Sequence, residues 1–401
     1  MNPPSMNSQQ ACPEVAATQA AIRLDRMQTE FRRGRPVVME AADPVAPVAI
    51  LAAVETLSAP RLQALVQTAG TPLLLLTEER LRAIGWSQAS GARALRLGSP
   101  ITVERAQRLA AVLPGAAPTA EAADLKSVRP AGPPLEGVLR LTKRARLVPA
   151  LLMFEPPAAA LPGLRKAEVH RIFDTDWIAS TGAQPGAASE LIRVSDAHMP
   201  IAACDDCMLV LFREPHGDAE HVAIVVGQPD LTLPVPVRMH SACLTGDLLG
   251  SRRCDCGDQL RLAIAHLAET GGVLLYLSQE GRGTGLANKL RAYRLQDAGL
   301  DTIDADCHLG FSADERDFGP AVAMLNQLGI SRIRLLTNNP HKVAFMRRAG
   351  LDVVDRVALL APVNAFNARY VQTKHDRAGH FAQAAPAPSA CDDPGNVPAA
   401  G

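Results

Sequence analysis

Short apolar runs that lead directly into helix-starting signals constrain the fold of this chain most. Residues 72–76 read Pro-Leu-Leu-Leu-Leu, and Thr77 then stands at the N-cap position of a helical segment. The apolar run 333–336 leads in the same way to Asn339, a good N-cap, and Pro340, a good first helical residue. Alternation of buried strands with helices favours an α+β or α/β fold with mixed sheets.

Length and charge narrow the class of protein. The chain has 401 residues, enough for two domains, and its 41 Lys and Arg balance its 41 Asp and Glu. Without a basic field we expect no nucleic-acid partner. The N-terminus lacks a basic start followed by an apolar run, and no stretch of about 18 apolar residues occurs, so we expect neither a secretory signal nor a membrane span. Cytoplasmic localisation follows, and reduced thiols suit a metal site there.

Composition predicts five segments along the chain. We expect a disordered lead over residues 1–19, an α/β domain over 20–118 and a Pro-rich connector over 119–189. Pattern and motif density rise sharply after that, which predicts a catalytic domain over 190–380. The Ala/Pro-rich segment 381–401 is of low complexity and is predicted to be disordered.

Three cysteines supply a candidate metal site. Cys243, Cys254 and Cys256 form a Cys-x10-Cys-x-Cys run with no fourth cysteine close by. Three thiolates and an open position describe a catalytic zinc rather than a structural one, because the open position holds the reacting water. The alternative is three buried cysteines without a metal. His240 is a candidate fourth ligand that would close the site, but we favour it as an outer contact or a substrate contact; the isolated pair at 204–207 receives no role.

Two strand-to-helix junctions are candidate anion sites. Residues 280–286 read Glu-Gly-Arg-Gly-Thr-Gly-Leu and follow the strand-like run 273–277. Glycines there let backbone N–H groups approach a phosphate, and Arg282 can add a charged fork, although this is not a Walker A loop. Thr337 and Lys342 flank the helix start at the second junction, where an ordinary strand-to-helix turn would be favoured without the other motifs.

An acidic run and a tyrosine complete the candidates. Residues 314–317 read Asp-Glu-Arg-Asp, which is usually a solvated charge run. Here apolar residues flank it at 309–311 and 318–320, which favours a loop held in place. Tyr293 shares a helical face with Leu286 and, taken alone, is more typical of a core tyrosine.

Together these segments resemble the GTP cyclohydrolase II family. The similar stretches are RMHSACLTGDLLGSRRCDCGDQL, LLYLSQEGRGTGLANKLRAYRLQDAGLDT, LGFSADERDF and RLLTNNPHKV, in the order and spacing of the family. They lie within residues 190–380. The resemblance implies the fold of that family, an enzyme that acts on cyclic amidines by hydrolysis, and a homodimer.

The resemblance also implies roles for single residues. It implies one Zn²⁺ held by Cys243, Cys254 and Cys256, with Mg²⁺ accompanying the triphosphate. Asp314 matches the family's proton acceptor and Arg316 its proposed nucleophile, while Tyr293 matches a conserved tyrosine. The implied GTP contacts are Arg238, Met239, His240, Ser241, Ala242, Gln259, Glu280, Gly281, Arg282, Thr302, Thr337 and Lys342.

The implied reaction is the first step of riboflavin biosynthesis. GTP would be hydrolysed to 2,5-diamino-6-ribosylamino-4(3H)-pyrimidinone 5′-phosphate, formate and pyrophosphate. Arg316 would act at the α-phosphorus as a nucleophile or as an electrostatic clamp, and the clamp is physically easier because a guanidinium is almost always protonated. Ala242 departs from the family, which usually has Glu there, and 283–285 is Gly-Thr-Gly in place of a Gly- or Asn-Ile-Gly sequence.

The N-terminal half weakly resembles 3,4-dihydroxy-2-butanone-4-phosphate synthase. The similarity lies in residues 33–38 and 51–86. That enzyme needs an acidic loop and a histidine for magnesium, whereas residues 39–47 here read Met-Glu-Ala-Ala-Asp-Pro-Val-Ala-Pro and no histidine precedes His170. We therefore predict a degenerate, catalytically inactive domain that serves at most as a binding scaffold or dimer module. Two alternatives remain for the whole chain: a GTP-binding relative that stops at the formamidopyrimidine, or a non-catalytic regulator.

Overall fold

The computed structural model describes residues 13–41, 48–113, 125–166, 168–176, 190–215, 219–379 and 381. These residues form two compact units. The first unit draws on Met1–Ala187, Glu214–Ala219 and Gln279–Asp317, and the second on Ala188–Arg213, Glu220–Ser278 and Phe318–Gly401. The first unit therefore includes a segment, 279–317, that comes from the middle of the predicted catalytic domain.

The first unit is built on a seven-stranded mixed sheet. Neighbouring strands are antiparallel except for the parallel pair β1 and β7. In sheet order the strands are β5 (Lys126–Pro130), β4 (Arg93–Arg96), β3 (Leu73–Leu76), β6 (Ala150–Phe154), β2 (Ala49–Ala53), β1 (Val37–Glu40) and β7 (His170–Phe173). The described helices that precede residue 190 are α1 (Pro13–Arg32), α2 (Ala59–Ala69), α3 (Glu78–Ala83), α4 (Val103–Leu109), α6 (Gly132–Arg144), a 3-10 turn (Ala158–Ala160) and α7 (Leu161–Lys166).

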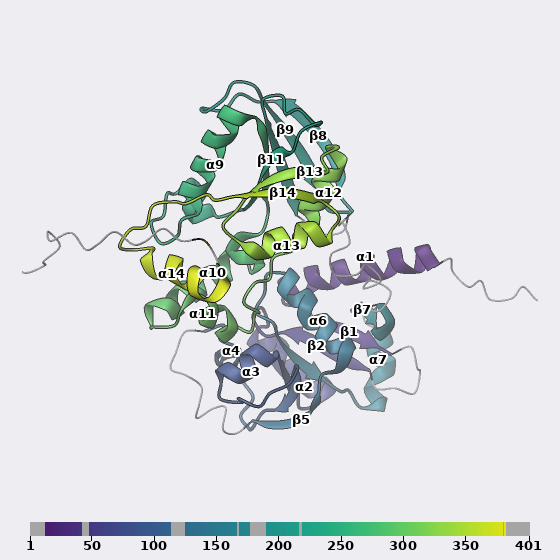
Figure 1. The fold of residues 1–401 in the computed structure, drawn as a ribbon. Helices are drawn as coiled ribbons and strands as arrows, with labels where there is room; N and C mark the ends of the chain where they lie inside the picture. Colours follow the sequence, from purple (N-terminus) through teal and green to yellow (C-terminus); the bar gives the residue numbers. More distant parts are fainter. Residues whose placement is uncertain are drawn as a thin grey trace, which may run out of the picture. The chain divides into compact units, whose positions relative to one another are not determined.

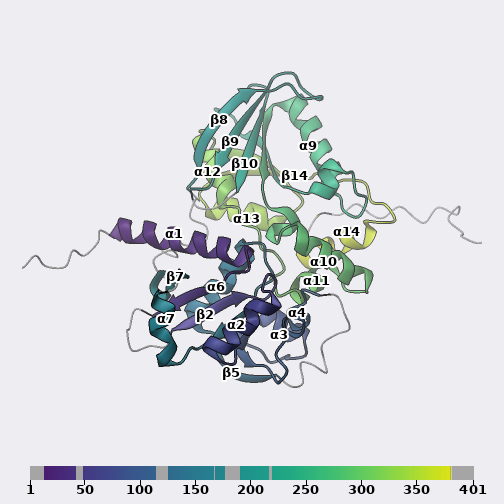
Figure 2. The same ribbon diagram turned by 180° about the vertical axis from the view of Figure 1, so that it is seen from behind.

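Helices cover both faces of this sheet (Figures 1 and 2). All four residues of β3 are buried, and their side chains alternate between two hydrophobic clusters. Leu74 and Leu76 belong to the cluster that includes residues of α2, α3 and α4, whereas Leu75 belongs to the one that includes residues of α1 and α6. Continuous apolar runs are typical of strands that are buried on both faces, which explains the Leu-rich sequence at 73–76.

The segment 279–317 packs against α3 inside the first unit. It forms a 3-10 turn (Glu280–Gly283), α10 (Leu286–Asp297) and α11 (Thr302–His308). Thr77 caps α3, as predicted, by accepting a hydrogen bond from Arg80 N, and its hydroxyl donates to Gly310 O at 2.9 Å. Arg80 is only 2% exposed and donates to His308 O at 2.7 Å and to Leu109 O at 2.6 Å. Burial lowers the pKa of Arg80 to about 9, so the guanidinium stays protonated at neutral pH.

The structure differs from the predicted boundaries of the first half. The segment 119–189, predicted to be a connector, supplies β5, α6, β6, the 3-10 turn, α7 and β7 of the first unit. Its prolines suggested a connector, but those in the first turn of α6 occupy positions where a helix tolerates proline. Helix α1 begins at Pro13, inside the predicted disordered lead 1–19. Residues 1–12 and the predicted tail, apart from 381, lie outside the described residues.

The second unit also has a seven-stranded mixed sheet. Four neighbours are parallel, in the order β14 (Asp352–Val357), β13 (Arg332–Leu336), β11 (Val235–Ser241) and β12 (Gly272–Leu277). The sheet continues antiparallel from β12 through β10 (Glu220–Val226), β9 (Cys207–Arg213) and β8 (Ile192–His198). The helices described in this unit are α9 (Cys256–Thr270), α12 (Gly319–Gln327), α13 (Pro340–Arg348) and α14 (Ala368–Ala378). The predicted mixed-sheet α/β class is confirmed for both units.

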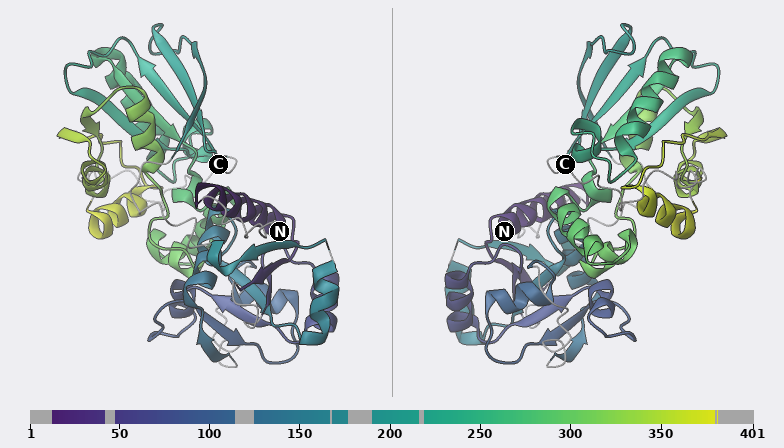
Figure 3. Two further views of the ribbon diagram at one scale, coloured as in Figure 1. Left: turned by 90° about the vertical axis from the view of Figure 1, so that its right-hand side faces the viewer. Right: turned by 90° about the vertical axis from the view of Figure 1, so that its left-hand side faces the viewer.

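Helices α9 and α12 lie on opposite faces of the second sheet. The two views of Figure 3, taken from opposite sides, show α12 in front of the sheet in one and α9 in the other. Alternation along β12 explains this: Leu274 packs in a cluster with Ala263 of α9, while Leu275 packs in a cluster with Met324 of α12. Both helices therefore fix the orientation of the central parallel strands.

The carboxyl ends of three parallel strands meet at one edge of the second sheet. Strands β11, β12 and β13 end at Ser241, Leu277 and Leu336, and Ser241 pairs with Leu277 in the register of β11 and β12. Helix α13 begins at Pro340 with Asn339 as its cap, as predicted, because the Asn339 side chain accepts from His341 N at 2.8 Å. In α/β sheets this edge is where ligands bind. Over the described ranges, no helix has the length and apolarity that crossing a membrane requires.

Candidate active site

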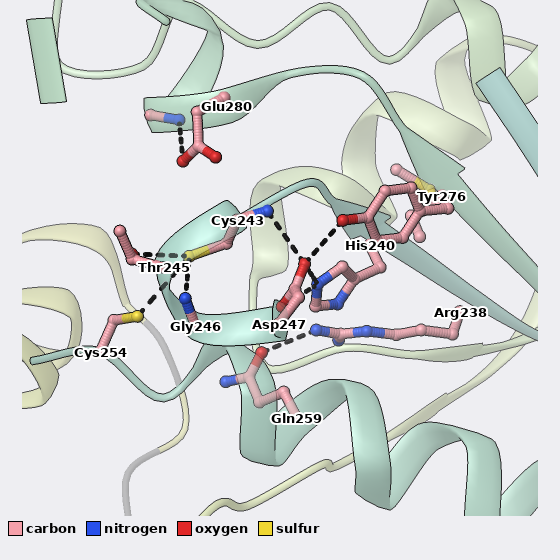
Figure 4. Close-up of polar contacts among 12 residues, drawn as sticks. Arg238, His240, Cys243, Thr245, Gly246, Asp247, Cys254, Gln259, Tyr276 and Glu280 are labelled. Carbon is pink, nitrogen blue, oxygen red and sulfur yellow. Dashed lines mark hydrogen bonds and ion pairs between the residues drawn. The ribbon is translucent and has the colours of Figure 1, made fainter. Parts of the chain in front are cut away.

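The three cysteines come together at the carboxyl edge of the second sheet. Cys243 follows β11 at the start of a π-helical turn (Leu244–Leu248), and Cys254 and Cys256 lie at the start of α9. The sulfurs of Cys243 and Cys254 are 3.7 Å apart (Figure 4), and all three sulfurs lie within 4.8 Å of one another. Among the residues that the structure describes, this is the group of cysteine, histidine or acidic side chains whose geometry could hold a metal ion.

The geometry of the three sulfurs fits a metal ion of the size of zinc. Tetrahedral coordination with Zn–S bonds of about 2.3 Å places the sulfurs about 3.8 Å apart. Gly246 leaves room for such a site, because a Cβ there would lie 3.0 Å from the Cys243 sulfur and 3.1 Å from the Cys254 sulfur. Its N–H also donates to the Cys243 sulfur at 3.3 Å. Hydrogen bonding to Cys243 raises the pKa of both Cys254 and Cys256, so the thiolate forms need a neighbouring cation.

A buried carboxylate fixes the first cysteine. Asp247 accepts from Cys243 N at 2.9 Å and from the Tyr276 hydroxyl at 2.9 Å, and His240 Nε2 lies 3.1 Å from each of its oxygens (Figure 4). The His240 ring stacks on Tyr276 with centroids 5.6 Å apart. Burial lowers the pKa of His240, which favours the neutral ring. His240 therefore contacts Asp247, which bonds to the backbone of Cys243, and is not part of the described metal group.

A chain of polar contacts supports the turn between the other two cysteines. Asp255 accepts from Lys374 Nζ of α14 at 2.7 Å and from Gln259 Nε2 at 2.6 Å. Gln259 Oε1 in turn accepts from Arg238 Nη2 at 2.7 Å (Figure 4), and Arg238 Nη1 donates to Leu336 O at 3.0 Å. Burial opposes ionisation of Asp255, but the ammonium of Lys374 outweighs it and lowers the pKa of Asp255. Arg238 and Gln259, two predicted substrate contacts, are thus bonded to each other.

Further predicted residues lie at the same edge of the second sheet. Lys342 is buried, donates to Met239 O at 2.9 Å and lies 5.4 Å from the centre of the Phe318 ring. Thr337 is also buried, and its hydroxyl accepts from the backbone N–H of residue 339 at 3.1 Å. Ala242 N donates to Leu277 O at 2.8 Å, so residue 242 extends the pairing of β11 with β12.

The hydroxyl of Ser241 and Nδ1 of His240 are buried at this edge and have no hydrogen-bond partner within the described part of the chain. Both belong to β11, next to the cysteine cluster. Buried polar atoms are rarely left unsatisfied, so a polar ligand at the carboxyl edge is the simplest reason for this pair.

The predicted residues of the first unit begin with the glycine-rich turn. Gly281 and Arg282 both adopt the left-handed conformation, with φ of 63° and 59°. Glu280 accepts from Lys289 Nζ at 2.8 Å, and Lys289 Nζ lies 5.8 Å from the centre of the Tyr293 ring. Arg282 donates to Ala313 O at 3.4 Å and pairs with the carboxylate of residue 306 at 3.5 Å. The backbone N–H groups of residues 281 and 283 are also hydrogen-bonded within this turn, to Glu280 Oε1 and Gln279 O, so the bonds of the turn and of Arg282 hold its shape.

Asp314 and Arg316 form a two-pronged ion pair in the first unit. Arg316 Nε donates to Asp314 Oδ1 at 2.7 Å and Nη2 donates to Oδ2 at 2.5 Å. Burial opposes ionisation of Asp314, yet the hydrogen bonds and charge of Arg316 outweigh it and lower the pKa of Asp314. A carboxylate with a lowered pKa is a poor base for a guanidinium. The buried Thr302 is the first residue of α11, whose cap is the side chain of Asp301.

Several residues of these networks were not predicted from the sequence. They are Asp247, Lys374, Lys289 and Asp306. Asp247 lies four residues after Cys243 in a short turn, and its contacts with the Cys243 backbone, Tyr276 and His240 distinguish it from a solvated aspartate. Lys374 lies 119 residues beyond Asp255, and no local pattern connects the two.

The raised pKa of Asp306 predicts a pH-dependent stability. Burial raises the pKa of Asp306 to about 7, although Arg282 opposes the shift, whereas an unfolded aspartate titrates near 3.9. The folded state therefore binds the proton more tightly, and the free energy of unfolding falls as the pH rises from about 4 to about 7. Asp306→Asn cannot ionise, so we expect its stability advantage over the wild type to grow by about 2 kcal/mol between pH 5 and pH 8. Urea unfolding at both pH values measures this, and a constant difference would contradict it.

A cysteine cluster at the carboxyl edge of a parallel sheet, beside buried cationic and polar side chains, is the type of site that a metal-assisted hydrolase uses. The sequence model of GTP cyclohydrolase II matches residues 192–358. The "GTP cyclohydrolase-2" of Azospirillum brasilense is 40% identical over 371 residues, which cover 90% of this chain and 95% of that protein. The "GTP cyclohydrolase-2" of Proteus mirabilis (strain HI4320) is 50% identical over 193 residues, which cover 48% of this chain and 96% of that protein.

The chain belongs to the GTP cyclohydrolase II family and is an enzyme of that family. The alternative of a non-catalytic regulator is thereby set aside. Among solved structures, RibBX of A. baumannii, a two-domain 3,4-dihydroxy-2-butanone 4-phosphate synthase, matches 84% of this chain and 99% of its own at 18% identity, with a TM-score of 0.31. A TM-score of this size leaves the synthase-like origin of the N-terminal half a prediction.

Proposed function

We propose that this enzyme hydrolyses GTP to 2,5-diamino-6-ribosylamino-4(3H)-pyrimidinone 5′-phosphate, formate and pyrophosphate, as the first step of riboflavin biosynthesis. The observation that carries this proposal is the three-sulfur cluster with zinc-compatible spacing, in a chain whose relatives are named GTP cyclohydrolase-2. Zinc held by Cys243, Cys254 and Cys256 would supply a Lewis acid that activates water for attack on the guanine imidazole.

Residues of β11 are proposed to bind the nucleotide beside the metal. The Ser241 hydroxyl and His240 Nδ1 lack protein partners in the described residues and are free to bond polar groups of GTP. Asp247 bonds to both His240 and the Cys243 backbone, so the positions of the His240 ring and the Cys243 sulfur relative to each other are fixed. Arg238, Met239, Ala242, Gln259, Thr337 and Lys342 are proposed as further GTP contacts. Ala242 lacks the carboxylate usual at this position, and its N–H already donates to Leu277 O, so it would contact GTP through its carbonyl or methyl group.

Residues of the first unit are proposed to bind and activate the phosphates. Glu280, Gly281, Arg282 and Thr302 are proposed GTP contacts, and Tyr293 acts beside Lys289. Arg316 is proposed to clamp the α-phosphate electrostatically, with Asp314 orienting its guanidinium through two hydrogen bonds. The lowered pKa of Asp314 supports the clamp, because removing a guanidinium proton needs a far stronger base. Mg²⁺ would accompany the pyrophosphate that leaves.

Three further expectations belong to the same proposal. We expect a homodimer. We also expect a cytoplasmic enzyme, because the cysteines described are free thiols. We also expect no synthase activity from the N-terminal half. His170, the first histidine of the chain, has its Nε2 2.7 Å from Arg23 O, so this ring nitrogen is already engaged.

Formate release from GTP tests the proposal. Zinc-loaded protein is incubated with GTP and Mg²⁺ under reducing conditions, with ATP as the matched nucleotide control, and formate is quantified. We expect formate from GTP alone. Accumulation of the formamidopyrimidine without formate would favour the alternative of a relative that stops after ring opening, with Ala242 as the first suspect.

A further inference from the structure

Lys143 of α6 forms a shielded ion pair with the loop that holds Asp314 and Arg316. Its Nζ lies 2.7 Å from Glu315 Oε1, and the two side chains are only 13% and 18% exposed. Lys143 belongs to the segment 119–189 that was predicted to be a connector, and 172 residues separate it from Glu315. Glu315 stands between the two residues proposed to act on the α-phosphate.

Glu315 in turn determines the shape of that loop. Its Oε1 accepts from Ser312 N at 2.6 Å, which closes the turn that leads into Asp314. Its backbone packs against the glycine-rich turn, because a Cβ on Gly283 would lie 2.7 Å from Glu315 O. The side chain of Glu315 is thus held by Lys143 and the main chain by Gly283. A shift of Glu315 would be passed directly to its two neighbours.

The same end of α6 holds the helix that follows the glycine-rich turn. Asn288 Nδ2 of α10 donates to Arg146 O at 3.0 Å, and a Cβ on Gly285 would lie 2.9 Å from the Arg146 Cβ. Arg291 of α10 pairs with Glu55 Oε1 at 2.9 Å, while Glu55 Oε2 accepts from Val148 N at 2.7 Å. Residues 55 and 143–148 therefore support both α10 and the 314–316 loop.

Lys143 also balances the charge of the 314–317 run. The 314–317 run carries three carboxylates and one guanidinium. In this arrangement Lys143 pairs with Glu315, and Arg316 makes its two-pronged ion pair with Asp314. Without Lys143, the shielded carboxylate of Glu315 would lack a cation and would compete for Arg316 or repel a triphosphate.

We propose that Lys143 is a positioning residue of the GTP reaction: through Glu315 it sets the geometry of Asp314 and Arg316, and so gives the N-terminal half a role in turnover without any chemistry of its own. This inference rests on the proposed function. The Proteus mirabilis relative aligns over 96% of its length with only 48% of this chain, so a family member can be built without a second half of this size. The support that α6 gives to the 314–316 loop is thus a feature of the longer chain.

Kinetics with a charge-removing and a charge-keeping variant test the proposal in the full chain. We expect Lys143→Met to lower kcat for formate release by roughly 10-fold with KM for GTP changed less than about 3-fold, because misplacement acts mainly on the transition state. Lys143→Arg should keep kcat within about 3-fold of the wild type, since the ion pair is preserved. In Lys143→Met/Glu315→Gln the uncompensated charge is gone, so part of the loss should be recovered. Lys126→Met, an exposed lysine of β5, is the matched control.

Hydrogen exchange separates this inference from the proposed function. Peptides that cover residues 311–318 should exchange faster in Lys143→Met than in the wild type and in Lys126→Met, whether or not GTP is turned over. Unchanged exchange there, or a kcat for Lys143→Met equal to that of the control, overturns the positioning role. If exchange over 311–318 is faster in Lys143→Met but the wild type releases no formate from GTP, the proposed function is overturned instead.

Discussion

Cys254→Ser is expected to lose bound zinc and to lower the rate of formate release by at least about 10³-fold, because the reaction needs the Lewis acid and a serine hydroxyl is a poor replacement for a thiolate. The sulfur of Cys254 lies 3.7 Å from that of Cys243 and next to Gly246, at the centre of the cluster. Metal analysis by mass spectrometry and a formate assay on the same preparation measure both effects.

The control for this variant is another cysteine of the second unit. Cys204→Ser removes a thiol from a partly buried position that is not part of the described metal group. We expect it to retain zinc and to keep formate release within about 2-fold of the wild type. Full zinc content in Cys254→Ser, or loss of zinc in Cys204→Ser alone, would contradict the assignment of the metal site.

Arg316 should reveal its role through the difference between two substitutions. As a clamp, Arg316 stabilises phosphate charge through a planar, two-pronged group, so Arg316→Met should lower kcat by about 10³-fold. Arg316→Lys keeps the charge but loses the fork, and we expect a smaller loss of about 10- to 100-fold. Steady-state kinetics with GTP measures both. Arg332→Lys, which alters an exposed arginine of β13 paired with Asp352, should leave kcat unchanged.

The clamp also predicts what will not accumulate on the enzyme. Since an Asp314 carboxylate with a lowered pKa is a poor base for any guanidinium, no nucleotidylated form of the enzyme should appear when the reaction with GTP is quenched early. Intact-protein mass spectrometry of the quenched wild type measures this. A nucleotidyl adduct that disappears in Arg316→Lys would contradict the clamp and would favour the nucleophile.

The local features of the site follow from the sequence. The cysteine spacing predicted a three-ligand cluster, and its three sulfurs lie together. The predicted helix caps at Thr77 and Asn339 are confirmed, because a capping side chain bonds to amides two or three residues away in the chain. Such features depend on neighbours in sequence, and a single sequence contains them.

What the sequence left open depends on partners that are distant in the chain. The segment 279–317 carries family motifs, yet it packs with the first unit through contacts such as Arg80 to His308 and Lys143 to Glu315. Strand β6 was missed because its apolar run lies among prolines that suggested a connector. Lys374 reaches Asp255 from the last described helix. Nothing in the local pattern of these residues distinguishes a buried partner from a solvated charge.

The most direct test of the central claim is the product balance of a single reaction. GTP is supplied to the zinc-loaded full chain with Mg²⁺, and formate, pyrophosphate and the pyrimidine 5′-phosphate are quantified in the same samples over time. Zinc-dependent GTP cyclohydrolase II chemistry predicts equal amounts of all three products, matching the GTP consumed. Pyrophosphate without formate, or consumption of GTP that is unchanged after the zinc is removed, would contradict it.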